Sequence, residues 1–245
     1  MMLIDCYTTP GAERETCMEA HELLRQMDRA SVDCAVIAPE DREIAVDNVL
    51  GNRRIFQMAS ESKGRFIPAC TVNPWFGDKG IAEMKRAAIA GARLLVLAPA
   101  LQGFVLTDEI CDGLFPEAAQ MNLPVYVHSG PHSSSCPTQL ALVAERFQQC
   151  RFILGHCGST DYSYDMPPVF GMKLPNLWFE LSFVRPWLIT AYVQQAGESR
   201  IIFGSSCPRN DLAFELEQSN SHWPIKDHPE TYGGNLLRLI KEVQA

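Results

Sequence analysis

Residues 124–129 read PVYVHS, a short and nearly continuous apolar run that ends in a histidine and a serine. Seven more runs of this kind occur along the chain: LIDCY (3–7), DCAVIA (33–38), RFIPACTV (65–72), ARLLVLA (92–98), RFILGH (151–156), LWFELS (177–182) and RIIFGS (200–205). This composition is typical of parallel strands, because helices cover both faces of a parallel sheet. The sequence therefore predicts eight parallel strands.

Amphipathic helical patterns separate these strands, as in RETCMEAHELLRQMDRA (14–30), KGIAEMKRAAIAG (79–91) and TQLALVAERFQQC (138–150). Eight strand–helix units in one chain favour a single (β/α)8 TIM barrel over residues 1–245, since that fold typically needs ~250 residues. The segment 159–176 lacks helical periodicity and is expected to form a long loop or an irregular helix. A doubly wound open sheet is the alternative, but DCYTTPG (5–11) is not its usual glycine-rich turn.

Composition limits the classes of partner. The net charge of −8 comes without any basic stripe, so we expect no nucleic-acid partner. The apolar runs are far shorter than the ~20 residues that cross a membrane, so we expect no membrane partner either. Nine cysteines without a C-x-x-C pair, and a start that lacks a signal-peptide pattern, predict a cytoplasmic protein with reduced thiols.

Six phrases occur in a fixed order: RFIPACTVNP (65–74), GARLLVLAPALQGF (91–104), LPVYVHSG (123–130), FILGHCGS (152–159), RIIFGSSCP (200–208) and GGNLLRLI (233–240). Together they resemble the amidohydrolase-2 family, which includes metal-dependent decarboxylases, hydratases and lactonases on a (β/α)8 barrel. The resemblance covers nearly the whole chain. It implies a small-molecule substrate or ligand bound at the C-terminal mouth of the barrel.

The resemblance also implies a set of metal ligands, from which this sequence departs. In the family an I-D-x-H-x-H motif on the first strand, a fifth-strand histidine, often a sixth-strand histidine and an eighth-strand aspartate surround a metal and its activated water. We expect Cys6 and Thr8 to stand at the H-x-H places and Ser206 at the aspartate place, while His128 and His156 remain. These five side chains are predicted to converge at the mouth.

The remaining residues limit metal binding. A catalytic zinc ion needs about three protein ligands and an open position. Cys6, His128 and His156 would form a Cys-His-His set, whereas Thr8 and Ser206 are neutral hydroxyls and poor ligands. We therefore expect either no cofactor or a single divalent metal such as zinc, and no binuclear or aspartate-assisted centre.

Catalysis without the aspartate would need another proton acceptor. Ser206 cannot serve as a general base near neutral pH, so His128 or His156 would have to carry the proton. A second hypothesis makes Cys6 a thiolate nucleophile paired with one of these histidines. Cys207 is the rival thiol, but strand alternation points it away from the barrel axis. The alternative is that the histidines are only hydrogen-bonded and that Cys6 is a packing residue.

Three further residues are predicted to border the pocket. Glu180 lies on the seventh strand, Arg185 could hold a carboxylate through two hydrogen bonds, and His132 lies on the loop after the fifth strand. The alternatives are that Glu180 caps a loop, that Arg185 forms a surface ion pair, and that His132 is simply exposed.

Two classes of function remain open. The first is a hydrolase or lyase that acts on a small carboxylated or cyclic metabolite with an atypical, metal-poor site. The second is a non-catalytic member of the family that binds a ligand or partner, since fold alone does not decide function. A homo-oligomer is compatible with either class.

Overall fold

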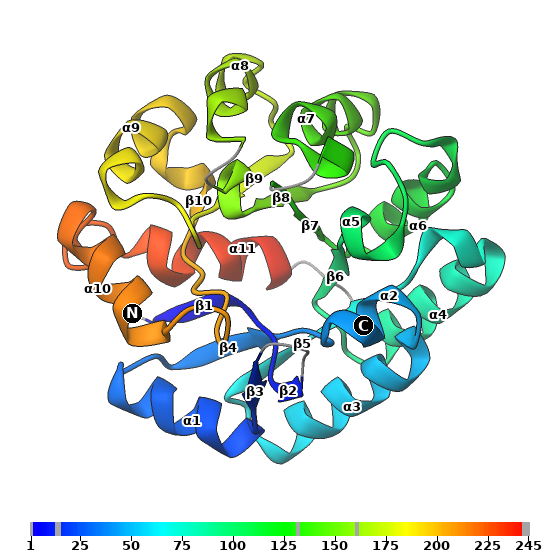
Figure 1. Ribbon diagram of the computed structural model, residues 1–245, viewed down its shortest axis with the longest axis horizontal. Coiled ribbons are helices and arrows are strands. Elements are labelled where there is room, and N and C mark those ends of the chain that lie inside the picture. Colours follow the sequence, from blue (N-terminus) through cyan, green and yellow to red (C-terminus); the bar gives the residue numbers. More distant parts are fainter. Residues whose placement is uncertain (1, 13–15, 131–132, 160–161, 242–245) are drawn as a thin grey trace.

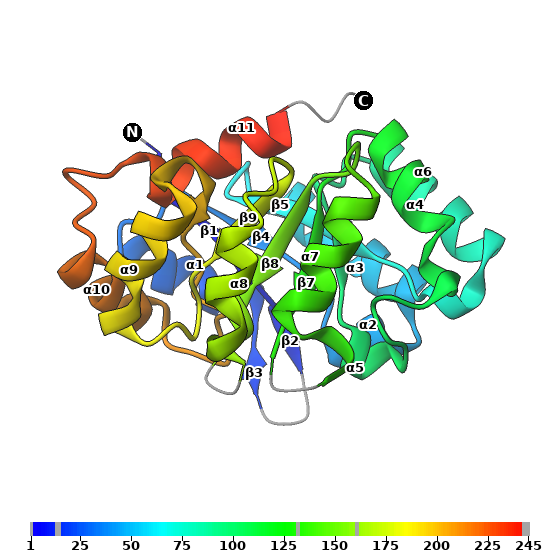
Figure 2. The same cartoon turned by 90° about the horizontal axis from the view of Figure 1, so that it is seen from above.

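The computed structural model describes residues 2–12, 16–130, 133–159 and 162–241. Its eight parallel strands pair in chain order around one barrel (Figure 1). They are β1 (Ile4–Thr8), β4 (Cys34–Ile37), β5 (Phe66–Thr71), β6 (Leu94–Leu97), β7 (Val125–His128), β8 (Phe152–Gly155), β9 (Leu177–Glu180) and β10 (Ile201–Ile202). This confirms the predicted (β/α)8 barrel, and each strand falls within its predicted run except β1, which extends one residue beyond it to Thr8. A short antiparallel hairpin, β2 (Gly11–Ala12) and β3 (Cys17–Met18), follows β1 on the mouth side (Figure 2).

Helices surround the barrel and cover the outer face of its strands (Figure 1). The α-helices are α1 (Ala20–Arg29), α2 (Asp41–Ala45), α3 (Asn48–Glu61), α4 (Asp78–Ile89), α5 (Pro99–Gln102), α6 (Leu114–Gln120), α7 (Pro137–Arg146), α8 (Met166–Gly171), α9 (Pro186–Ala196), α10 (Leu212–His222) and α11 (Asn235–Lys241). Short 3-10 turns are η1 (Pro74–Phe76), η2 (Glu109–Cys111), η3 (Ser133–Ser135), η4 (His156–Gly158), η5 (Ser163–Asp165) and η6 (Glu198–Arg200), and η7 (Glu230–Gly234) is a π turn. As expected, only the short helix α8 and the turn η5 occur in the described part of 159–176.

The barrel closes between its first and last strands. The Cys6 N–H donates to the Phe203 carbonyl at 3.1 Å, the Ser206 N–H donates to the Tyr7 carbonyl at 3.1 Å, and the Thr9 N–H donates to the Cys207 carbonyl at 2.9 Å. These bonds join segments about two hundred residues apart in the chain. An open doubly wound sheet is therefore excluded.

The interior of the barrel is apolar and is covered at one end by α11. Inward-facing residues of the strands, such as Ile4, Leu94 and Ile202, pack against Leu236 and Leu239 of α11. Figure 1 shows α11 lying across the barrel, and Figure 2 shows that it lies at the end opposite the β2–β3 hairpin. The N-terminal opening is thus filled, and the C-terminal ends of the strands form the accessible mouth. No helix in the described ranges is both long and apolar enough to cross a membrane.

The packing of α11 predicts the effect of shortening a side chain at the covered end. Leu236 is fully buried, so Leu236→Ala should lower the free energy of unfolding by about 2–5 kcal/mol, through lost apolar burial and the cavity left behind. Chemical denaturation measures this change. Ile89→Ala on α4 is the control, because Ile89 is 71% exposed and its loss should cost far less. Equal effects of the two substitutions would contradict this account of the barrel's lower end.

Candidate functional site at the barrel mouth

Two histidines meet at the C-terminal ends of neighbouring strands. His128 ends β7 and His156 directly follows β8. The Nδ1 atom of His128 lies 2.8 Å from the Nε2 atom of His156. The other nitrogen of His128 lies 2.8 Å from the Tyr7 hydroxyl, and that of His156 lies 2.6 Å from Ser182 Oγ. All four ring nitrogens therefore have a hydrogen-bond partner within the protein.

Two tyrosines support this pair from inside the barrel. The rings of Tyr7 and Tyr126 stack with centroids 4.7 Å apart and an interplanar angle of 7°. Tyr7 also meets His128 edge-on, with ring centroids 4.7 Å apart. Tyr126 and His128 are two residues apart on β7, so strand alternation places both on the interior face. The stacking holds the Tyr7 hydroxyl against the imidazole.

A buried carboxylate lies beneath the histidines. Glu180 has no exposed surface, and its Oε2 accepts hydrogen bonds from the Tyr126 hydroxyl at 2.8 Å and the Ser182 hydroxyl at 2.8 Å. The backbone N–H groups of His156 and Ser182 donate to the same carboxylate at 3.0 and 2.6 Å. Burial raises the pKa of Glu180, and these four hydrogen bonds oppose that rise because they stabilise the ionised form.

Both imidazoles are neutral at neutral pH. Burial lowers the pKa of His128 well below its usual 6.5, and His156 and the positive charge of Arg209 lower it further. Burial, with a smaller effect of Arg209, lowers the pKa of His156 to about 3. Neutral imidazoles have one N–H donor and one bare acceptor nitrogen each, so the pair can both give and take a proton.

A cavity of about 310 Å³ opens directly above the pair. His128 and His156 form part of its wall, together with the apolar side chains of Leu101 and Phe183. This volume suits a small molecule, since ligand pockets usually start near ~300 Å³. The mixture of apolar wall and polar floor favours a compact ligand that is partly apolar.

One cation lies at the rim of this cavity. Arg209 follows β10 and lines the cavity, where it pairs with Asp41 of α2. The bond to Asp41 involves a terminal nitrogen of Arg209, and a guanidinium has five N–H donors in all. Arg209 therefore brings a positive charge to the cavity wall, where it also pairs with Asp41.

Backbone strain marks the same region. His156, Phe183 and Ser206 have positive φ angles of 64°, 60° and 59°, in the left-handed region that non-glycine residues seldom adopt. They follow the ends of the adjacent strands β8, β9 and β10. Such conformations cost roughly 1–3 kcal/mol each and tend to cluster at functional sites. Of these three residues, His156 and Phe183 line the cavity.

The expected places of the H-x-H pair need correction. Aligned letter by letter with Ile4–Thr9, the I-D-x-H-x-H motif places its histidines at Tyr7 and Thr9, not at Cys6 and Thr8. The geometry agrees, because Tyr7 meets His128 whereas the Thr8 hydroxyl donates to the Val36 carbonyl at 2.8 Å. The register of β1 shifts between Asp5 and Thr8, and such an irregularity re-aims side chains.

Cys6 lies in the apolar interior below the mouth. Its side chain packs with the interior cluster that contains Ile4 and Val36, and no hydrogen bond joins its thiol to either histidine among the described residues. Burial raises the pKa of this thiol well above its usual value, and the nearby Glu180 raises it further. A neutral thiol without an imidazole partner does not fit the thiolate–imidazole hypothesis.

The donor set does not fit a divalent metal. Within the described ranges, no three His, Cys, Asp or Glu side chains come close enough together to bind an ion, so the Cys6–His128–His156 set is not formed. The hydroxyls of Thr9 and Ser206 are buried and have no hydrogen-bond partner in the described part of the chain. Both are neutral, and neither offsets a divalent charge.

The structure places the remaining residues that the sequence singled out in different parts of the molecule. Glu180 lies beneath the histidine pair and not on the cavity wall, while Ser206 lies buried after β10. Arg185 is exposed, with its guanidinium 5.6 Å from the centre of the Trp187 ring, and it does not line the cavity. Cys207 points outward to Met18, as expected. His132 lies outside the described residues.

Sequence reasoning missed four contributors: Tyr7, Tyr126, Ser182 and Arg209. Tyr126 was detectable by its spacing of two from His128, and Ser182 by the same spacing from Glu180. A stricter alignment of the first-strand motif would have identified Tyr7. Arg209 carries no local signal, because its role comes from the fold that brings it beside α2.

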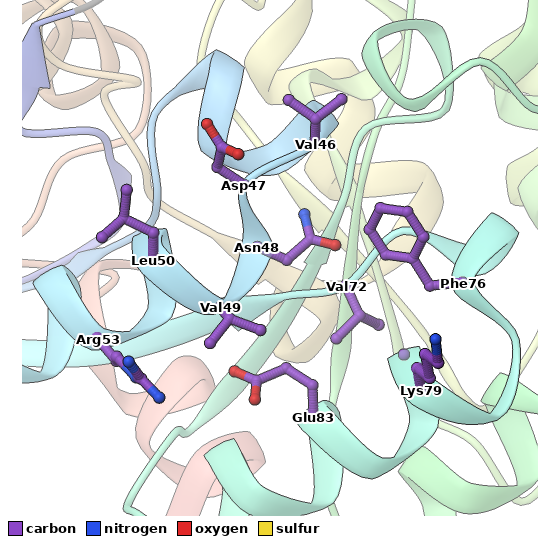
Figure 3. A pocket seen from close by; sticks show the side chains of 11 residues that line it. Val46, Asp47, Asn48, Val49, Leu50, Arg53, Val72, Phe76, Lys79 and Glu83 are labelled. Carbon is purple, nitrogen blue, oxygen red and sulfur yellow. The ribbon is translucent and has the colours of Figure 1, made fainter.

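A second cavity, of about 460 Å³, lies on the outside of the barrel between α3 and α4 (Figure 3). Val49 and Leu50 of α3 face Phe76 and Lys79 across it. It contains none of the sequence-predicted site residues and no pair of hydrogen-bonded titratable groups. The mouth cavity is therefore the candidate functional site.

A (β/α)8 barrel with two histidines from neighbouring strands at its mouth is the arrangement that the resemblance in the sequence implied. The family model described as Amidohydrolase matches residues 17–230, and the chain belongs to this family. A search of curated proteins found no match.

Solved structures show the same fold at low sequence identity. The 5-carboxyvanillate decarboxylase of Sphingomonas paucimobilis has a TM-score of 0.79 and 15% identity, over 98% of this chain and 99% of that one. A manganese-bound form of 5-carboxyvanillate decarboxylase from Novosphingobium aromaticivorans has a TM-score of 0.80 and 14% identity, over 98% and 97%. The 4-oxalomesaconate hydratase of Rhodopseudomonas palustris has a TM-score of 0.74 and 16% identity, over 98% and 96%.

The lowered pKa of His156 predicts how stability depends on pH. Below pH 6.5 the unfolded chain takes up a proton at this histidine that the folded chain refuses until about pH 3, so stability is lost as the pH falls. The stability advantage of wild type over His156→Gln should shrink by about 2 kcal/mol between pH 7 and pH 5. Denaturation at both pH values measures it. The exposed His21→Gln substitution is the control, and an unchanged advantage at His156 would contradict a neutral imidazole there.

Proposed function

We propose that this protein binds a small carboxylated aromatic or cyclic molecule in the mouth cavity and performs acid–base chemistry on it, as a lyase or hydrolase. The observation that carries the proposal is the neutral His128–His156 pair in the wall of a cavity that has Arg209 at its rim. The pair supplies proton transfer, and the arginine supplies recognition of an anion.

The walls of the cavity support a flat, partly apolar ligand. Phe183 and Leu101 offer apolar contact, while the guanidinium of Arg209 offers a positive charge that attracts a carboxylate. One related structure, the 2,6-dihydroxybenzoate decarboxylase, contains 2,6-dihydroxybenzoate, and the manganese-bound decarboxylase contains a substituted nitrobenzoic acid. A ligand of that chemical class would direct its carboxylate to Arg209 and its ring to Phe183.

The histidines would act on the bound molecule as neutral acid and base. Their ring nitrogens already have protein partners, so a reacting group must exchange with one of these bonds or pass a proton through them. General acid–base catalysis of this kind contributes on the order of 100-fold to 10,000-fold in rate. His128 is the more accessible of the two and is the residue we assign to contact with the ligand.

A non-catalytic ligand-binding protein is the second candidate. The observation that favours it is the complete hydrogen bonding of both imidazoles, because every ring nitrogen already has a partner within the protein. The two candidates share the same cavity and the same arginine. They differ only in whether the bound molecule is converted.

Binding and turnover separate the two candidates. We expect Arg209→Gln to weaken binding of hydroxybenzoates and cyclic carboxylates roughly 10- to 100-fold, because it removes a charged hydrogen bond and leaves Asp41 unpaired. Arg185→Gln is the matched control, since that exposed arginine follows Phe183 by two residues in the chain but does not line the cavity. Calorimetric titration against a panel of such acids measures both. Equal loss in both variants, or binding by neither wild type nor variant, would refute the proposed ligand class.

Turnover of a bound acid should depend on His128. His128→Gln is expected to lower turnover on the order of 100-fold or more, with a much smaller change in affinity, because the imidazole moves a proton while Arg209 holds the ligand. Product formation followed by NMR measures it. Tight binding without any product in wild type would establish the non-catalytic candidate instead.

A single zinc or manganese ion is the competing proposal for the chemistry. The neutral donor set at the mouth argues against it, and we expect turnover to persist after chelator treatment. Adding back zinc or manganese should change the rate less than twofold, as measured on the same acid. Activity that disappears with the chelator and returns with one of these ions would establish the metal-dependent alternative.

A further inference from the structure

We propose that Ser182 and Glu180 are positioning residues for the histidine pair, and that they form with Tyr7, His128 and His156 a directed relay that carries a proton inward from the mouth to Glu180. The use of this relay in catalysis rests on the function proposed above. Its direction does not, because it follows from hydrogen-bond geometry and can be measured without a ligand.

The direction is set at the buried end. Glu180 receives two backbone N–H groups and two hydroxyls, so its carboxylate is an acceptor only. The Ser182 hydroxyl has a single proton, which it donates to Glu180 Oε2. Ser182 Oγ must therefore accept at its 2.6 Å contact, and the donor there is the Nδ1–H of His156.

The remaining tautomers follow in sequence. A neutral His156 that is protonated at Nδ1 has a bare Nε2, so at the 2.8 Å contact it accepts from the Nδ1–H of His128. His128 is then bare at Nε2 and accepts from the Tyr7 hydroxyl at 2.8 Å. Every donor in the chain from Tyr7 to Glu180 thus points toward the buried carboxylate.

A proton can move along this chain without leaving a charge on either ring. The proton enters at His128, which lines the cavity, where the bound molecule takes the place of Tyr7 as the hydrogen-bond donor. The bond between that proton and the bound molecule breaks as His128 Nε2–H forms, and His128 Nδ1–H breaks as His156 Nε2–H forms. His156 Nδ1–H then breaks as a new Ser182 O–H forms, and the original Ser182 proton passes to Glu180 Oε2. Both imidazoles have changed tautomer, and Glu180 is neutral.

The surroundings favour this route over a charged histidine. Glu180, Ser182 and His156 are all buried, and an isolated imidazolium among them would pay a large desolvation cost. The transfer converts the buried carboxylate into a neutral acid, which the same dry environment stabilises. Stacking on Tyr126 holds Tyr7 in line with His128. The relay therefore moves negative charge from the interior toward the mouth.

Nitrogen NMR of the ligand-free protein tests the direction. In protein labelled with 15N-histidine at pH 7, correlation of ring nitrogens with ring protons should show both histidines protonated at Nδ1 and bare at Nε2. His128→Gln and His156→Gln each remove one set of signals and so assign them. An Nε2–H tautomer, or an imidazolium, at either ring in wild type would overturn the proposal.

Two serine variants test the positioning role. Ser182→Ala removes the acceptor for His156 Nδ1–H, so most of the His156 population should change to the Nε2–H tautomer, and His128 should follow because the two rings share a hydrogen bond. Ser182→Thr keeps the hydroxyl and should restore the wild-type signals. Ser129→Ala is the control, since that buried serine adjoins His128, and within the described residues its hydroxyl bonds only to backbone atoms of Gly155 and Gly158.

The outcomes also separate this proposal from the proposed function. Unchanged tautomers in Ser182→Ala would overturn the relay, whatever the protein binds. Nδ1–H tautomers that respond to Ser182 support the relay, even if every acid in the panel fails to bind. Where an acid is converted, Ser182→Ala should lower its turnover at least tenfold and leave its affinity unchanged, and Ser182→Thr should recover most of the rate. Full activity in Ser182→Ala would overturn the catalytic use of the relay.

Discussion

The Glu180 carboxylate connects three neighbouring strands at the barrel mouth. It receives the Tyr126 hydroxyl from β7, the backbone of His156 after β8, and both the backbone and hydroxyl of Ser182 after β9. A buried carboxylate without such partners would be strongly destabilising, so the four donors must be in place for this part of the barrel to pack. The same bonds fix where the two imidazoles lie.

A second buried carboxylate has a comparable role where the barrel closes. Asp5 on β1 accepts hydrogen bonds from the Ser205 N–H at 2.9 Å and from the Tyr7 N–H at 3.2 Å, and burial raises the pKa of Asp5 to about 7. These contacts hold the end of β1 against the segment after β10. Tyr7 is thereby presented to His128, at the place where the family motif would have a histidine. A structural contact of β1 thus determines which side chain completes the site.

This arrangement differs in kind from a metal centre. A divalent ion needs several donors that carry or concentrate negative charge, whereas the described groups at this mouth are neutral, and Tyr7, His128 and His156 are hydrogen-bonded to one another. The negative charge lies one layer deeper, on Glu180, and reaches the mouth only through the hydrogen-bonded rings. The Asp41–Arg209 pair at the rim is the one strong electrostatic feature of the described cavity wall. In the proposed function, Arg209 at the rim therefore recognises the ligand, while the hydrogen-bonded groups below it transfer the proton.

The sequence by itself determined the eight strands, the closed barrel, and the meeting of His128 and His156. Burial on both faces is visible in local composition, and parallel strands place their C-terminal ends together. Tertiary structure alone decided that Tyr7 completes the site, that Cys6 lies in the core, and that Arg209 lines the cavity. The shift in β1 between Asp5 and Thr8 breaks the alternation on which sequence reasoning relies. The directions of the hydrogen bonds depend on Glu180 and Ser182, far from Tyr7 in the chain, and no local pattern encodes such long-range contacts.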